Sequence, residues 1–277
     1  MASVDVTVRG AGIFGLSIAW ACLQRGARVR VIETAHPGAG SSGGLVGALS
    51  PHVPEAWNAK KAFQLDSLLM AADWWAKVEA ASSLPSGYAR HGRLQPLPDD
   101  RAVEAARRRE AEAATLWQGR AVWQVIPATG AEWEPVTPTG WLVHDTLSAR
   151  LSPRMAIDSL VAGLTAQGAE LILGEAEDTG AVIHATGIAG LADLSKAFAT
   201  PLGSGVKGQA LSLSYDARDQ PQLFVDGLHI VPHADGTVAI GSTSETTWTY
   251  DAPDAQLDAL HANAIAAVPA LAAAEII

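Results

Sequence analysis

The chain has 277 residues, 48% hydrophobic and 17% charged, with a formal net charge of −10. This composition is that of a globular protein with one large domain or two ordinary ones, and it excludes an intrinsically disordered chain. The acidic balance argues against nucleic-acid binding, and the single cysteine, Cys22, excludes an intrachain disulfide framework.

The first 33 residues predict a βαβ unit. Residues 4–8 alternate apolar side chains as a strand does, and the apolar residues between 16 and 27 recur at helical spacing. Residues 28–33 form the second strand. No basic leader precedes the unit and no apolar run is long enough to cross a bilayer, so we expect a soluble, cytoplasmic protein.

A glycine pattern between the first strand and the helix indicates a dinucleotide site. Gly10, Gly12 and Gly15 form G-x-G-x-x-G, in which the glycines allow a tight turn, close approach of a pyrophosphate and packing of helix on strand. The helix N-terminus then offers free N–H groups to phosphate. Glu33 ends the second strand, where a carboxylate accepts hydrogen bonds from ribose hydroxyls and disfavours NADP. The alternative is a glycine turn that only joins packed elements.

The rest of the chain predicts an α/β fold. A loop of small residues spans 37–44, a loop rich in Pro and Trp spans 127–141, and Asp235-Gly236 predicts a hairpin turn. Helices are expected at 60–81, 101–116, 153–168 and 254–268, and strands at 92–97, 170–173, 181–185, 207–214, 223–231 and 237–241.

These elements divide into two domains. We expect a Rossmann-type FAD-binding domain at 1–85 and 150–200, discontinuous in sequence. An antiparallel β-rich (α+β) substrate domain takes 86–149 and 201–277. The segment from Ser41 to Gly44 and the Thr186-Gly187 pair favour FAD over NAD as the dinucleotide.

Four stretches resemble the D-amino-acid oxidase / glycine oxidase family. They are GAGIFG with Glu33, SSGGLVGALSP, VKGQALSL and HIVPHADGTVAIGSTSE, and the resemblance covers nearly the whole chain. The last is similar to a hairpin of glycine-oxidase-like enzymes. SSGGLVGALSP resembles the oxidase module of the bifunctional enzyme that matures wobble uridines in tRNA.

The resemblance implies FAD as the cofactor. It implies Ile13 and Phe14 near the pyrophosphate, Glu33 and Thr34 at the ribose, Ser41 and Ser42 at the phosphates, Gly47, Ala48 and Leu49 near the flavin ring, and the backbone near Ala176 at the adenine. The implied substrate is a small amine or amino acid. Hydride transfer from a C–H beside the nitrogen to flavin N5 gives an imine, which hydrolyses, and dioxygen reoxidises the flavin.

Two histidines are the candidates for substrate contact. His229 stands where glycine oxidases place a substrate-contacting tyrosine, and His52 follows the segment that approaches the flavin. We therefore expect both to be catalytic residues, and the alternative for His229 is an interior histidine that bonds to backbone groups. His233 is expected on the surface of the hairpin. No Cys/His cluster is present, so no metal is expected.

The expected activity is oxidation of the C–N bond of an amino acid or secondary amine. A tRNA-modification oxidase that acts on a carboxymethylaminomethyl group is the first alternative. The second is a truncated, non-catalytic flavin-binding remnant, because the family normally continues past Ile277 with a segment that holds a substrate-binding arginine. The sequence is compatible with a monomer and with a homo-oligomer.

Overall fold

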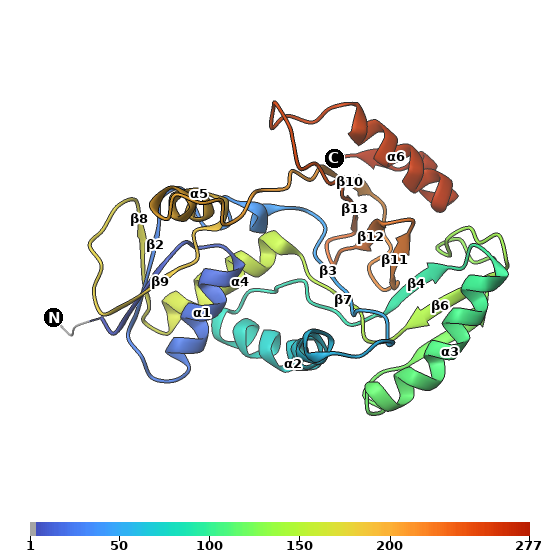
Figure 1. Cartoon of the computed structure of the whole chain (residues 1–277), viewed down its shortest axis with the longest axis horizontal. Coiled ribbons are helices and arrows are strands. Elements are labelled where there is room, and N and C mark those ends of the chain that lie inside the picture. The colour runs from blue at the N-terminus through green and yellow to red at the C-terminus, as the bar shows by residue number, and fades with distance from the viewer. Residues whose placement is uncertain (1–3) are drawn as a thin grey trace.

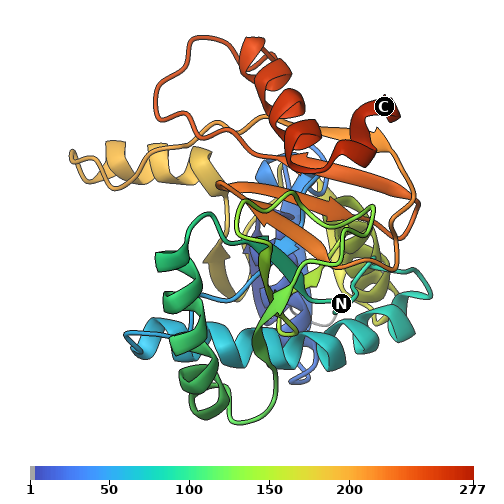
Figure 2. The same cartoon turned by 90° about the vertical axis from the view of Figure 1, so that its right-hand side faces the viewer.

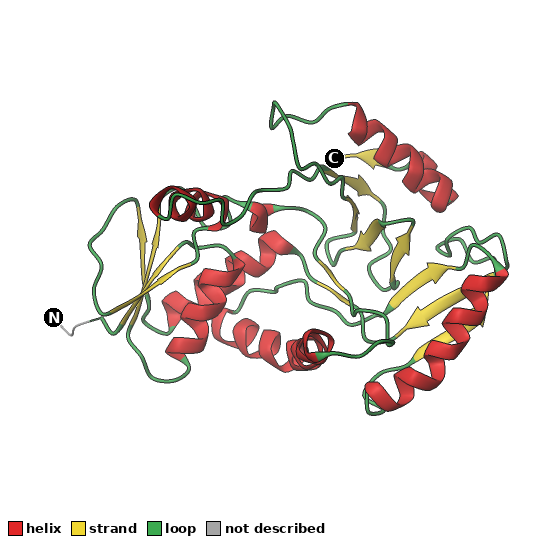
Figure 3. Ribbon diagram, viewed as in Figure 1, coloured by secondary structure: helices red, strands yellow, loops and turns green. Residues whose placement is uncertain are grey.

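The structure is a computed structural model that describes residues 4–277, and it contains two main sheets with helices around them (Figures 1 and 3). The smaller sheet has the strand order β8-β2-β1-β9 and is parallel throughout. Its strands are β1 (Val6–Arg9), β2 (Val29–Glu33), β8 (Glu170–Leu173) and β9 (Ala181–His184). This arrangement is the predicted Rossmann-type unit.

Two helices pack against the parallel sheet, and a third packs on the outer of the two. Helix α1 (Ile13–Leu23) contacts β1 and β2, α4 (Pro153–Ala166) contacts α1 and β8, and α2 (Ala59–Ser82) packs on α4 (Figure 1). Their shared core contains Leu16, Trp20, Val31, Trp75 and Leu160. This core fixes the start of α1 against the ends of β1 and β2, where a dinucleotide binds in folds of this type.

The larger sheet has eight strands in the order β14-β10-β13-β12-β11-β4-β6-β5, and only the β11–β4 pair is parallel. Its strands are β4 (Arg93–Pro96), β5 (Trp123–Pro127), β6 (Trp141–Asp145), β10 (Ala210–Ser214), β11 (Gln222–Val225), β12 (Leu228–Pro232), β13 (Thr237–Gly241) and β14 (Glu275–Ile276). Helix α3 (Asp100–Leu116) packs on β5, and α6 (Ala255–Ala267) packs on β10, β12 and β13. The mixed α/β fold class is therefore as predicted.

A short ribbon lies between the two sheets. It pairs β3 (Ala48–Leu49) with β7 (Ala149–Arg150), just after the 3-10 turn η1 (Ser41–Gly43) (Figure 1). A second 3-10 turn, η2 (Pro269–Ala273), follows α6. Among residues 4–277 no helix combines the length and the apolar character that crossing a membrane requires.

One predicted strand was wrong. Residues 223–231 are not continuous but form the β11–β12 hairpin, which turns at Asp226-Gly227. Both turn residues have positive φ, 49° and 84°. Asp-Gly is the preferred sequence for such a two-residue turn because both positions tolerate the left-handed conformation. The same signal that indicates the turn at 235–236 therefore also marks this one.

Helix α5 (Gly187–Ala197) was not predicted, and none of its residues is buried. In Figure 2 it projects at the left of the molecule. Ile188 and Leu194 are 57% and 46% exposed, so little tertiary packing stabilises the helix.

We predict that α5 is locally unstable. Its backbone amides should exchange with deuterium at least about 100-fold faster than those of α1, because regions with few buried contacts open without global unfolding. Hydrogen exchange read by mass spectrometry on peptides from both helices tests this. Equal protection of α1 and α5 would contradict it.

Candidate functional site

The predicted glycine turn forms as the sequence indicates. Gly10 follows β1 with φ +102°, and a Cβ there would meet the carbonyl oxygen of Ala185 beyond β9. A Cβ on Gly15 would meet the Gly10 carbonyl, and one on Gly12 would stand 3.1 Å from Ser42 Oγ. Each glycine therefore permits a close approach that a larger residue would block.

The N-terminus of α1 faces this turn. Gly12 precedes the helix and gives it no side-chain cap, and the Ile13 N–H donates to Ser42 Oγ at 3.0 Å. Ser42 belongs to η1, which we call the serine loop, so this loop lies directly against the first turn of α1. Ser41 beside it is exposed. Free amides, a hydroxyl and the absence of side chains are the features that suit a pyrophosphate. The residues present therefore fit FAD.

Glu33 is held against the same turn. Its Oε2 accepts from the Ala11 N–H at 2.8 Å and its Oε1 from the Ala35 N–H at 3.0 Å. The carboxylate is half-buried, and Thr34 beside it is exposed. A fixed carboxylate at the end of β2 is suited to ribose hydroxyls.

The remaining candidates for cofactor contact lie around this centre. Ile13 is half-buried, whereas Phe14 is 79% exposed. The Ala176 carbonyl accepts from Arg9 Nη2 at 2.9 Å, and Arg9 also pairs with Asp178 at 2.7 Å. These contacts hold the 175–178 segment close to the end of β1.

Residues 45–49 connect the dinucleotide region to the larger sheet. The Gly47 carbonyl accepts from the Leu151 N–H at 2.9 Å, and a Cβ on Gly47 would lie 2.9 Å from Pro153 Cδ. Val46 fills the space where a side chain at Gly241 would stand. The start of this segment therefore lies next to the end of β13.

His229 lies on the face of the larger sheet opposite α6. Its neighbours Leu228 and Ile230 point into the core beneath that helix, so His229 points the other way. It is paired with Phe224 and Gly241, and its ring centre lies 4.7 Å from that of Phe224. Burial, and second the charge of Arg93, lower the pKa of His229 below 6.5.

His52 has a different environment. Its backbone N–H donates to Gln64 Oε1 of α2 at 2.7 Å, and its ring Nδ1 contacts the same oxygen. Gln64 in turn donates to the Ser50 carbonyl at 3.1 Å. The hydrogen bonds of His52 thus run to α2, and none runs to β12.

The prediction that His233 lies on the surface was wrong. His233 is only 4% exposed, and its Nε2 lies 2.9 Å from the Leu45 carbonyl oxygen. It continues the face that carries His229, since residues two apart along an extended strand point the same way. Alternation from His229 was the sequence signal that places it inside.

We predict that folding stability falls in mild acid. Burial lowers the pKa of His233 below 6.5, and that of His229 is lowered as well. The unfolded chain then binds protons more readily than the folded one. The stabilisation from these two neutral histidines is therefore complete above pH 6.5 and is lost as the pH falls towards their pKa values in the folded state. Urea unfolding at pH 7.5 and 5.5 measures the loss. His233→Gln should reduce it, whereas His36→Gln, an exposed control, should not.

An ion pair that sequence reasoning missed lies beside this face. Arg93 Nε donates to Asp145 Oδ2 at 2.9 Å, and Asp145 is completely buried. Asp145 also accepts from the N–H and hydroxyl of Ser148, at 2.7 and 3.0 Å. The guanidinium carbon of Arg93 lies 5.5 Å from the Phe224 ring centre.

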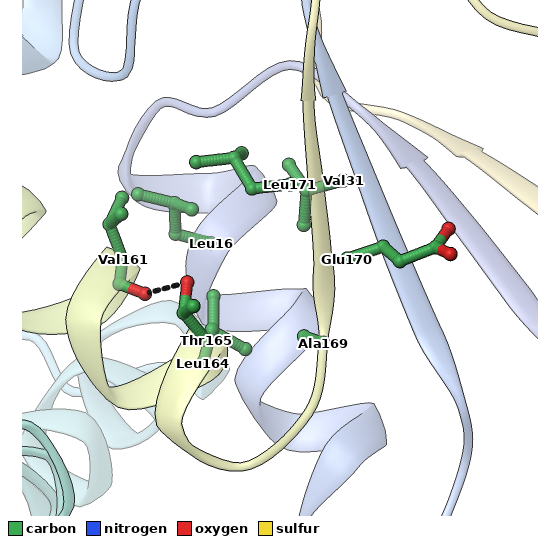
Figure 4. Close-up of a pocket in the computed structure, with 8 residues that line it drawn as sticks. All are labelled: Leu16, Val31, Val161, Leu164, Thr165, Ala169, Glu170 and Leu171. Carbon is green, nitrogen blue, oxygen red and sulfur yellow. Dashed lines mark hydrogen bonds between the residues drawn. The ribbon is translucent and has the colours of Figure 1, made fainter.

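Two hollows are separate from these histidines. One, of about 10 Å³, lies between α1, α4 and the parallel sheet and is lined mostly by apolar side chains, including Leu16, Val31 and Leu164 (Figure 4). It is about large enough for one water molecule and is a packing gap. The other, of about 410 Å³, lies beside the 36–43 loop and Arg154. Within residues 4–277 no three His, Cys, Asp or Glu side chains cluster as metal ligands.

The family model described as DAO, FAD dependent oxidoreductase, matches residues 5–277. The chain belongs to this family. Its cofactor is FAD, as predicted. The crystal structure of glycine oxidase from Geobacillus kaustophilus superimposes with a TM-score of 0.79, covering 99% of this chain and 80% of that one at 20% identity. That likeness confirms the fold.

Two curated relatives of this DAO-family chain carry more specific names. A putative thiamine biosynthesis oxidoreductase, ThiO, of Rhizobium etli is 31% identical over 214 residues, covering 74% of this chain and 59% of the relative. The tRNA 5-methylaminomethyl-2-thiouridine biosynthesis bifunctional protein MnmC of Chromohalobacter salexigens is 31% identical over 157 residues, covering 53% and 22%. The chain spans less than two thirds of the length of either relative.

Proposed function

We propose that this DAO-family chain oxidises the C–N bond of an amino acid or a secondary amine. The observation that carries the proposal is the contact between the dinucleotide region and the β12–β13 hairpin. Leu45 bonds to His233, and Val46 packs on Gly241. The sheet face that bears His229 therefore lies beside the segment that we expect to approach the flavin ring.

The cofactor would be held by residues from 1–85 and 150–200, the proposed FAD domain. The amides at the start of α1 and the hydroxyls of the serine loop would hold the pyrophosphate, and Glu33 with Thr34 the ribose. The backbone near Ala176 would contact adenine. Residues 86–149 and 201–277 would form the substrate domain.

His229 would orient the substrate nitrogen. Its lowered pKa keeps the imidazole neutral at pH 7, so it can accept a hydrogen bond from an ammonium or amine group. When bound, FAD supplies the acceptor for the hydride that leaves the carbon beside that nitrogen. His52, whose hydrogen bonds run to Gln64 of α2, is proposed as a second substrate contact.

Spectroscopy of the purified full chain with added FAD tests the proposal. Absorption bands at about 370 and 450 nm that persist through gel filtration are expected from bound flavin. When glycine, N-methylglycine and D-alanine are added anaerobically in separate experiments, at least one of them should bleach the longer-wavelength band. A colourless protein counts against the proposal. A yellow protein that no amine bleaches supports the non-catalytic flavin-binding alternative.

Oxidation of a tRNA nucleoside is the second candidate function. The similarity to MnmC favours it, whereas the net charge of −10 opposes binding of a polyanion. Incubation of the FAD-loaded chain with tRNA that carries carboxymethylaminomethyl-uridine, followed by mass spectrometry of the nucleosides, separates the two. Loss of the carboxymethyl group without reaction of free amino acids would favour the tRNA substrate.

A further inference from the structure

Three side chains from neighbouring strands form a row on the sheet face that bears His229. Arg93 of β4 lies against Phe224 of β11, and Phe224 lies against His229 of β12. We propose that Arg93 is a positioning residue that keeps the His229 imidazole neutral and in place, so that His229 takes a proton from the ammonium group of an amine substrate. The proposal rests on the proposed function.

Arg93 is fixed in this row. Its side chain is 7% exposed and its Nε is bonded to the buried Asp145, which Ser148 holds in turn. A guanidinium stays charged at any pH that a folded protein tolerates. Its position 5.5 Å from the Phe224 ring centre is within the range of a cation–π contact, so the charge and the ring stabilise each other.

The positive charge acts on His229 across the ring of Phe224. Burial and a nearby cation both disfavour the imidazolium form, and both lower the pKa of His229. The other titratable groups near this face are Asp145, which lies behind Arg93, the buried His233, and the buried Arg150 of β7, whose charge acts on His233. The facing residues of β11 and β13, Phe224 and Gly241, carry no charge, and residues 45–47 carry none either.

Helix α6 packs beneath the opposite face, so Asp258 and His261 lie away from His229. Leu260 and Ala264 of this helix share a core with Leu228 and Ile230. Arg93 is thus the one cation that the described residues place in the row with His229.

The neutral imidazole has a defined task in amine oxidation. The substrate enters mainly as an ammonium ion, and its nitrogen must lose a proton before its lone pair can assist departure of the hydride from the adjacent carbon. One N–H bond of the ammonium group breaks, its electron pair stays on nitrogen, and the proton forms an N–H bond on the imidazole. Nδ1 of His229 is buried and has no hydrogen-bond partner among the described residues, so Nε2 is the nitrogen that a substrate reaches. Nε2 accepts the proton in the tautomer that carries its hydrogen on Nδ1.

Imidazole titration by NMR tests the proposal on the full chain with FAD and without substrate. The His229 signal is assigned by its loss in His229→Gln. Arg93→Met should increase the proton affinity of His229, because the cation that disfavours the imidazolium form is gone. Arg93→Lys should leave it low, as should Arg101→Gln, which removes an exposed arginine at the start of α3.

Arg93→Met leaves Asp145 buried and unpaired, so a second variant guards against failure to fold. Arg93→Met with Asp145→Asn removes both charges and keeps an acceptor for the Ser148 N–H, and His229 should again bind protons more tightly. Unchanged titration of His229 in the folded variants overturns the proposal, whether or not any amine is oxidised.

The pH dependence of flavin reduction tests the proton transfer itself. The rate of flavin reduction by a reactive amine falls in acid, and this fall, the acid limb of the pH profile, should move to higher pH in Arg93→Met. The shift in pH should equal the shift of the His229 titration midpoint. A shifted titration with an unmoved acid limb overturns the role of His229 as proton acceptor. If no amine bleaches the flavin, the proposed function fails, while the NMR titration still decides the role of Arg93.

Discussion

Gly12→Val is expected to weaken FAD binding by at least about 100-fold, or about 2.7 kcal/mol. Gly12 has φ −80° and ψ 178°, extended backbone that valine also adopts, so the fold should survive. Its added Cβ would stand 3.1 Å from Ser42 Oγ, in the gap that the pyrophosphate has to enter. Titration of the apoprotein with FAD, followed by flavin fluorescence, measures the change.

Gly203→Ala is the matched control for Gly12→Val. The added Cβ would meet only the end of the flexible Leu191 side chain, so FAD affinity should stay as it is. Urea unfolding of both apoproteins separates loss of binding from loss of fold. Tight FAD binding by a folded Gly12→Val protein would show that the pyrophosphate does not pass at Gly12.

Asp145→Ala is expected to lower the free energy of unfolding by about 3–5 kcal/mol. Asp145 is completely buried and carries the only ion pair of Arg93 in the part of the chain that the structure describes. Its removal strands a buried guanidinium and leaves the Ser148 N–H without its acceptor. Urea unfolding of the apoprotein measures the loss.

Asp216→Ala supplies the comparison for Asp145→Ala. Asp216 pairs with Arg218 at 2.8 Å, but both side chains are about half-exposed. Exposed ion pairs contribute little, since solvent screens them, and the unfolding midpoint should scarcely move. Equal effects of the two substitutions would mean that burial of the Arg93–Asp145 pair does not determine its contribution.

Local sequence was sufficient to predict the dinucleotide half of the fold. The glycines, Glu33 and the alternating apolar residues interact with near neighbours along the chain, and the strand at 170–173 forms with the bounds predicted. Helix α5 was missed because Gly187 and Gly190 lower its helix propensity and it presents no buried face. Strands β5 and β6 were missed because β5 pairs only with β6, and β6 joins the sheet by pairing with β4, which is distant in sequence.

The residues of the candidate site divide in the same way, into those marked by local sequence and those joined by contacts distant in sequence. The cofactor candidates were visible as a motif, whereas the Arg93–Asp145 pair joins residues 52 apart that only the register of β4 against β6 brings together. Nothing in the sequence around Arg93 indicates its partner. His233 was misplaced although the alternation from His229 carries the information, because it follows Pro232 at the end of a hairpin strand, where side chains are usually exposed.

Strand β9 ends the parallel sheet, and residues 4–277 place no further strand beside it. Parallel sheets are ordinarily enclosed, and an uncovered margin presents a ladder of N–H and C=O groups that another extended chain can pair with. Val182 on this strand is 37% exposed, so an apolar side chain accompanies the open ladder. Concentrated solutions of the chain should therefore become turbid on warming before the parallel sheet itself melts.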